Sequence, residues 1–233
     1  MRLLIAAVLC LLTVLPQQPS PLADFLLPAS ALPAADAGPL RLGFLLAGFG
    51  IPTGIVTTDN PSDPETFKAD VSGPASVRLA VVVARFAAAH SDYLAAIDRG
   101  ILTIARRDLV CGRQIDLISI RPTVVDSDLS KLLVLLSWMA SGEPPPGPAG
   151  TMSVIPGKAG DPPARSLPLV HFASTAGTTL RQAFDRAVQE NKGGAWIVWQ
   201  HVLPDGRIAC RSAGYYGNGR TVGASTKDFW TEK

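Results

Sequence analysis

The sequence predicts an α/β protein with a mostly parallel sheet, helices on both faces of the sheet and a C-terminal antiparallel hairpin. Three observations support this prediction. Short apolar runs alternate along the chain with longer segments of helical periodicity, as in βαβ units. The clearest helix, at residues 180–188, follows an apolar run at residues 167–172. Two apolar segments, residues 195–203 and 207–215, flank a Pro-Asp-Gly turn that is typical of a hairpin. An α+β arrangement is the alternative.

The N-terminal part of this domain is expected to contain a strand and a long helix. Residues 40–47 form an apolar run that ends in a glycine-rich loop, which favours a buried strand. Residues 74–99 are predicted to form one helix, with a proline at its first position and Gly100 as its terminator.

The middle of the chain is predicted to continue the alternation of strands and helices. Residues 115–120 are expected to form a strand, and residues 129–139 a helix capped by Asp126 or Ser127. Residues 152–155 are expected to form a brief strand between two exposed loops. The mature protein is therefore interpreted as a single α/β domain over residues 40–233.

The first residues have the profile of a secretory signal peptide. Arg2 precedes an apolar run over residues 3–15, which is shorter than the roughly 20 residues that a membrane-spanning helix needs. Residues 1–31 are therefore interpreted as a signal peptide and leader, and no stable membrane span is expected after cleavage. An uncleaved anchor helix is the alternative.

The sequence gives a range of positions for signal-peptide cleavage. Small-x-small triplets occur at residues 29–31 and 35–37, so the mature protein is expected to start between Asp24 and Gly38. The residues from 17 to 39 are rich in Pro, Ala and Ser and are interpreted as a processed or disordered leader.

The cysteines agree with an extracytoplasmic location, either periplasmic or secreted. Cys10 leaves with the signal, and Cys111 and Cys210 remain as a pair. A Cys111–Cys210 disulfide is expected, with two separate buried thiols as the alternative.

Composition argues against several classes of partner. The net charge is only +2, and the basic residues are scattered, so no nucleic-acid partner is expected. His90, His171 and His201 share no ligand spacing, so neither a metal site nor a cofactor is predicted.

The turn over residues 173–179 is the predicted ligand-binding site. It joins a strand to the clearest helix and carries four hydroxyl groups, from Ser174, Thr175, Thr178 and Thr179. Free N–H groups at a helix start attract anions, and ligands of open α/β sheets bind beyond the carboxyl ends of strands. The alternative is that these residues merely cap the helix.

Two other motifs were considered for chemistry. The glycine-rich residues 48–54 lack the dinucleotide-binding spacing and are interpreted as a turn. Ser174 and Ser212 are candidate nucleophiles of a serine hydrolase, but neither lies between the flanking glycines of a nucleophile elbow. No catalytic residue is therefore assigned.

Several segments resemble the N-terminal lobe of the branched-chain amino-acid type of periplasmic substrate-binding protein. The Gly-Arg-Gln-Ile-Asp-Leu segment resembles a family strand, and a Pro-Leu-Val run leads into a Ser/Thr-rich turn as in the family. The resemblance implies that Ser174 and Thr175 contact the ligand and that a membrane transporter is a partner. The matching segments are residues 42–46, 112–117, 126–136, 152–155 and 168–170.

These observations lead to one functional hypothesis and two alternatives. The chain is interpreted as an exported, non-catalytic module that binds a small polar or carboxylated solute such as an amino acid. The alternatives are an extracytoplasmic serine hydrolase and a structural accessory protein of the cell envelope.

Overall fold

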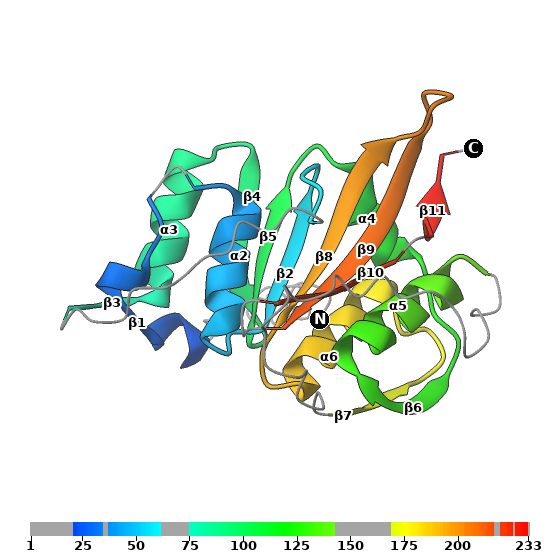
Figure 1. The fold of residues 1–233 in the computed structure, drawn as a ribbon, viewed down its shortest axis with the longest axis horizontal. Coiled ribbons are helices and arrows are strands. Elements are labelled where there is room, and N and C mark those ends of the chain that lie inside the picture. The colour runs from blue at the N-terminus through cyan, green and yellow to red at the C-terminus, as the bar shows by residue number, and fades with distance from the viewer. Residues whose placement is uncertain are drawn as a thin grey trace, which may run out of the picture.

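A single mixed β-sheet forms the centre of the protein (Figure 1). The computed structural model describes residues 21–34, 37–61, 75–142, 169–216, 220–225 and 227–232. The strand order is β10-β9-β8-β2-β5-β4, and β11 also pairs with β9. The strands are β2 (Thr53–Thr57), β4 (Tyr93–Asp98), β5 (Ile101–Arg106), β8 (Ala195–Val202), β9 (Ile208–Tyr216), β10 (Arg220–Ala224) and β11 (Trp230–Thr231).

Three parallel strands lie at the centre of this sheet. β2 lies between β5 and β8 and runs parallel to both, and all five of its residues are buried. β4 pairs antiparallel with β5 at one edge, and the β8–β9 hairpin extends the other side. The predicted α/β class, with parallel central strands and a C-terminal antiparallel hairpin, is confirmed.

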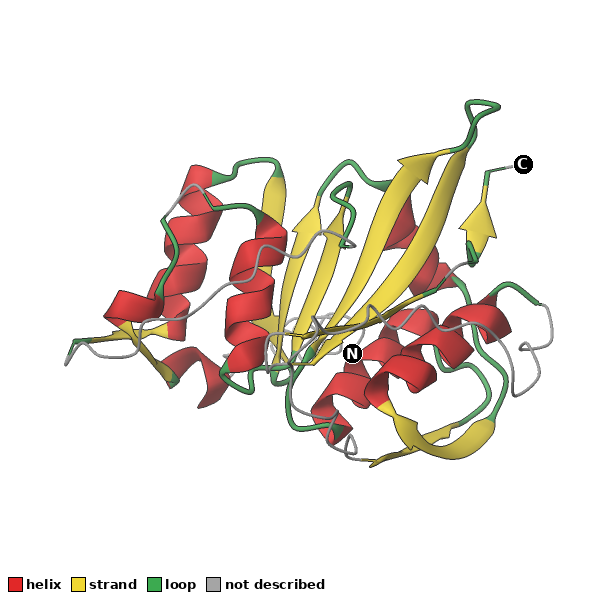
Figure 2. Ribbon diagram, in the orientation of Figure 1, coloured by secondary structure: helices red, strands yellow, loops and turns green. Residues whose placement is uncertain are grey.

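Helices cover both faces of the sheet, as predicted (Figure 2). On one face Ile197 and Trp199 of β8 pack with Phe44 of α2, while Trp196 and Val198 point to the other face. α2 and α3 cover the first face, and α4, α5 and α6 cover the second. The helices are α2 (Pro39–Gly48), α3 (Leu79–Ala89), α4 (Val110–Leu117), α5 (Leu129–Ala140) and α6 (Leu180–Glu190).

Two small antiparallel sheets flank the central one. β1 (Leu26–Pro28) pairs with β3 (Ser76–Arg78) beside α3, and short 3-10 turns, η1 (Pro21–Asp24) and η2 (Ala29–Ala31), flank β1. β6 (Thr123–Asp128) pairs with β7 (Leu169–Ser174) on the side of α5 and α6.

The prediction of a strand at residues 40–47 is wrong, because these residues form most of α2. Seven of the ten residues of α2 are buried, and Pro39 stands in its first turn. A helix that is buried around most of its circumference shows a continuous apolar run, which periodicity does not distinguish from a buried strand. The strand that enters the sheet is instead β2, which follows α2.

The single helix predicted over residues 74–99 is divided in the structure. α3 ends at Ala89, and β4 begins after a turn at residues 91–92. Tyr93, Ala95 and Ile97 alternate toward the core that α3 also contacts, which is strand periodicity. The apolar residues of α3 and β4 adjoin so closely that the two elements resemble one helix in the sequence.

The strand predicted at residues 115–120, which the family resemblance also implies at residues 112–117, is replaced by α4. Cys111 and Ile115 are one helical turn apart and are both fully buried. Only Ser119 makes an isolated bridge, to Thr179.

Several local predictions are confirmed. α6 follows β7 as expected, and α5 matches the helix predicted at residues 129–139, but its cap is Asp128 and not Asp126 or Ser127. The Asp128 side chain accepts a hydrogen bond from Lys131 N at 3.0 Å, whereas residues 126 and 127 lie within β6. Cys111 and Cys210 form the predicted disulfide. The expected strand at residues 152–155 lies outside the described residues.

The leader interpretation needs correction for residues 21–34. These residues are packed into the folded unit, because β1 pairs with β3 and Leu27 is fully buried. The folded unit therefore includes residues before position 40.

Candidate functional site

Ser174, the first residue of the predicted site, has two partners inside the fold. Its Oγ accepts a hydrogen bond from Thr123 N at 3.1 Å and donates one to Arg121 O at 3.2 Å. Its residue is only 7% exposed. Ser174 therefore joins the end of β7 to the start of β6.

The three threonines of the turn also form local contacts. Thr178 Oγ1 accepts from Thr175 N at 3.2 Å and lies 3.5 Å from Thr175 Oγ1. Thr179 and Gln182 form a reciprocal capping box at the start of α6, with bonds of 3.2 and 3.0 Å. The structure thus brings the four predicted residues together, with their hydroxyl groups used in shaping the turn and the helix end.

The position of this turn also differs from the expected one. β7 pairs with β6 in a separate two-stranded sheet and not with the parallel strands at the centre. The turn consequently does not lie at the carboxyl edge of the central sheet, which was the geometric reason for expecting a ligand there.

Ser212, the other candidate nucleophile, is buried in the core. It is 1% exposed, and its Oγ pairs closely with Ser137 Oγ of α5. Ser137 in turn donates to Leu133 O at 2.9 Å. These contacts describe a satisfied buried hydroxyl pair between α5 and β9.

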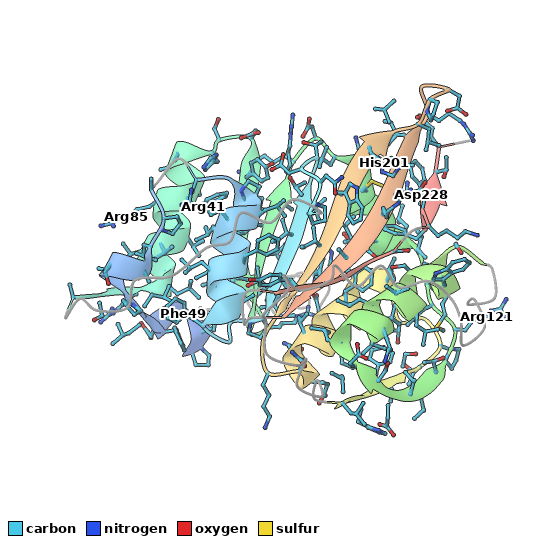
Figure 3. The ribbon with its side chains drawn as sticks, in the orientation of Figure 1. Arg41, Phe49, Arg85, Arg121, His201 and Asp228 are labelled. Atoms are coloured by element: carbon cyan, nitrogen blue, oxygen red, sulfur yellow. A yellow bond between two sulfur atoms is a disulfide. The ribbon has the colours of Figure 1, made fainter. Side chains whose placement is uncertain are left out.

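The three histidines lie in separate places. His171 pairs with Asp126 across the exposed β6–β7 ladder at 2.6 Å, and His90 stacks on Phe86. His201 Nε2 lies 3.3 Å from Asp228 Oδ1, which also accepts from Arg211 Nε at 2.8 Å. Figure 3 shows His201 and Asp228 beside one another near the β8–β9 hairpin. This group ties the C-terminal segment to the hairpin.

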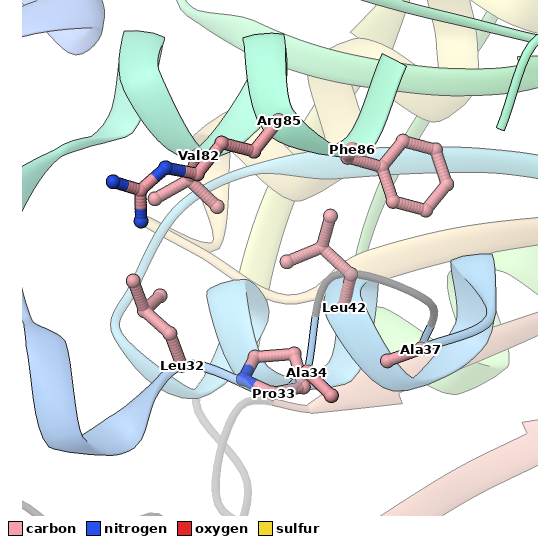
Figure 4. A pocket seen from close by; sticks show the side chains of 8 residues that line it. All are labelled: Leu32, Pro33, Ala34, Ala37, Leu42, Val82, Arg85 and Phe86. Atoms are coloured by element: carbon pink, nitrogen blue, oxygen red, sulfur yellow. The ribbon is translucent and has the colours of Figure 1, made fainter. Parts of the chain in front are cut away.

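A pocket lies between α2, α3 and the chain that precedes α2 (Figure 4). Its cavity volume is about 90 Å³, which is roughly the volume of three water molecules. A cavity that holds benzene measures roughly 150 Å³, so this pocket suits a body of a few carbon atoms. The lining residues are Leu32, Pro33, Ala34, Ala37, Leu42, Val82, Arg85 and Phe86.

Local structure explains how these side chains meet. Val82, Arg85 and Phe86 are three and four residues apart and therefore share one face of α3. Leu42 projects from the facing side of α2, and the β1–β3 ladder holds the segment before α2 against α3. The walls thus come from three segments that are separate in sequence.

Among the described residues of the pocket lining, Arg85 is the only charged one. Its guanidinium group lies on the opposite side of the pocket from the Phe86 ring (Figure 4). Across the described residues, Arg85 makes no ion pair or hydrogen bond through its side chain. An apolar pocket with one unpaired guanidinium has the chemistry to hold a small carboxylate.

Sequence reasoning did not select Arg85 as a site residue. A signal was present, because Arg85 is the only charged residue between Leu79 and Ala89, a segment otherwise made of apolar side chains. The facing walls come from α2, which was expected to be a strand, and from residues 32–34 and Ala37, which were expected to be a leader.

Among the residues that the structure describes, no helix combines the length and apolar character needed to span a membrane. Within the same ranges, no group of three or more His, Cys, Asp or Glu side chains is placed to hold a metal ion. Comparisons with protein-family models, with curated proteins and with solved structures give no match.

Proposed function

We propose that this chain is an exported, non-catalytic binding module that holds a small carboxylated solute in the Arg85 pocket. The observation that carries the proposal is the Arg85 guanidinium beside an apolar cavity, without a partner among the residues that the structure describes. Export is supported by the signal-like N-terminus and by the Cys111–Cys210 disulfide, which forms in oxidising compartments. A membrane transporter that receives the solute belongs to the same proposal.

The lining narrows the class of solute. Arg85 can pair with a carboxylate through two parallel hydrogen bonds, whereas the lining residues that the structure describes include no carboxylate for the ammonium group of an amino acid. Burying an unpaired ammonium group is costly. We therefore expect a short, branched carboxylate such as isovalerate to bind more tightly than leucine.

Calorimetric titration of isovalerate into the oxidised protein tests this proposal. The neutral analogue isovaleramide should bind at least about tenfold more weakly, because it lacks the charge that Arg85 recognises. The Arg85→Gln variant should lose a similar factor for isovalerate. It should lose nothing for the amide.

Arg107→Gln is the matched control. Arg107 is exposed, lies in the turn after β5 and is not among the pocket residues. Arg107→Gln changes the net charge by the same amount as Arg85→Gln. Affinity for isovalerate should be unchanged in this variant. No detectable binding by the wild type at millimolar isovalerate, or equal affinity in Arg85→Gln, would refute the proposal and favour a structural role.

A further inference from the structure

The first described residues are an integral part of the fold rather than a removable leader. We call residues 21–34 the N-terminal strap. Leu79 N donates to Phe25 O and Ala29 N donates to Ala75 O, both at 2.8 Å, on either side of the β1–β3 ladder. These bonds hold the strap against the start of α3.

Side-chain packing supports the same conclusion. Leu27 is fully buried in a cluster that contains Leu79, Val82 and Phe86, and Ala31 is 1% exposed. The end of the strap supplies Leu32 and Pro33 to the wall of the Arg85 pocket. A chain that starts at residue 32 or later loses β1 and Leu27. The side chains of Leu79, Val82 and Phe86, which share the cluster with Leu27, then become more exposed to water.

We infer that signal processing occurs before Phe25, and that Ala23–Asp24 is the last bond ahead of β1 that follows a small residue. Cleavage there gives up the bond from Phe25 N to Leu22 O, of 3.1 Å, but keeps the ladder and Leu27. Ala23 is a small residue immediately before the cut, and Pro21 stands at the other position of the small-x-small pattern. Water adds across the peptide bond, giving a carboxylate on Ala23 and an ammonium group on Asp24.

The packing of the N-terminal strap narrows the range of signal-cleavage positions that the sequence allows. The triplets at residues 29–31 and 35–37 are excluded as cleavage sites, since a cut at either one removes β1 and Leu27. The inference rests on export as proposed above, but it does not depend on the identity of the solute.

Mass spectrometry of the N-terminal peptide, after expression of the full chain in an exporting bacterial host, tests the inference. The expected N-terminus is Asp24 or an earlier residue. Ala23→Gln should block or shift processing if the last permitted bond is used, whereas Ala29→Gln should leave the N-terminus unchanged. An N-terminus at residue 32 or 38 overturns the inference while export stands. A chain of full mass outside the cytoplasm overturns this inference while export stands. A chain of full mass that stays in the cytoplasm overturns the export proposal and this inference with it.

A pair of variants checks that the strap stabilises the protein. Leu27→Ala should lower Tm by about 5 °C or more, because it opens a cavity in the core. Leu26→Ala, whose side chain lies on the same strand but is 58% exposed, should change Tm by no more than about 1–2 °C. Equal effects of the two variants would contradict a packed strap.

Discussion

The indole Nε1 of Trp196 donates a 2.8 Å hydrogen bond to Oδ1 of Asp185 between β8 and α6. The guanidinium of Arg181 lies 5.7 Å from the centroid of the same indole ring and pairs with Asp116. Burial raises the pKa of Asp185 from its usual 3.8 to about 6, and the bond from Trp196 and the charge of Arg181 reduce this rise only in part.

A raised pKa in the folded state means that folding favours the neutral carboxyl group. The free energy of unfolding should therefore fall as the pH rises from about 4 to about 6, and the full cost should be present above that range. Asp185→Asn retains an acceptor for Trp196 without the charge. It should raise the free energy of unfolding at pH 7 by up to about 3 kcal/mol and have little effect at pH 4.

Urea unfolding of both proteins at pH 4 and pH 7 measures this difference. Glu190→Gln is the control, because Glu190 is an exposed carboxylate on the same helix. This control should follow the wild type at both pH values. An Asp185→Asn protein with the same pH dependence as the wild type would show that another group titrates.

The Cys111–Cys210 disulfide should contribute strongly to stability, because it joins α4 to β9 across a separation of 99 residues. In the chain-entropy model a loop of this length stabilises the fold by about 4–5 kcal/mol. The double variant Cys111→Ala/Cys210→Ala should lose much of that amount in urea unfolding. Cys10→Ala should lose none.

Thiol titration gives an independent check of the same bond. A denatured, unreduced chain that has lost Cys10 should show no free thiol, and a chain that keeps Cys10 should show one. Two thiols in the Cys10-free chain would contradict the disulfide.

Ser174→Ala should lower the free energy of unfolding. The substitution removes the partner of Thr123 N and of Arg121 O at a site that is largely buried, which costs about 1–3 kcal/mol. Thr179→Ala removes a capping box and should cost about 1 kcal/mol. Isovalerate affinity should be unchanged in both variants. A tenfold loss of affinity in Ser174→Ala would show that the ligand binds at the turn over residues 173–179 and not in the Arg85 pocket.

Alanine substitutions at two glycines should have opposite effects on the free energy of unfolding. A Cβ on Gly54 would overlap the indole of Trp196, so Gly54→Ala should lower the free energy of unfolding by about 1–3 kcal/mol. Gly112 stands inside α4, where a Cβ would meet Val56 Cγ1 at an ordinary 3.5 Å. Gly112→Ala should stabilise by about 0.5–1 kcal/mol, and urea unfolding of the pair measures both effects.

Local signals predicted the parts of the fold that depend on neighbouring residues. The apolar periodicity of residues 180–188 predicted α6, and a Pro-Asp-Gly turn predicted the β8–β9 hairpin. The two cysteines predicted their pairing because few alternatives existed.

The remaining elements depend on contacts that are distant in sequence. Thr53–Thr57 become a central strand only because β5 and β8 lie on either side of them. The pocket likewise forms only where residues 32–34, Leu42 and Arg85 come together, and the periodicity of a single segment does not predict that contact. The candidate site was therefore missed for the same reason as the central strand.

The position of β2 also affects the order in which the protein folds. Its five residues pair on one side with residues 102–105 and on the other with residues 195–199. The second partner is synthesised long after β2, and pairing across so long a segment is slow. Until β8 has been synthesised, one edge of β2 therefore has no partner strand, and its closure by β8 should be a late step of folding.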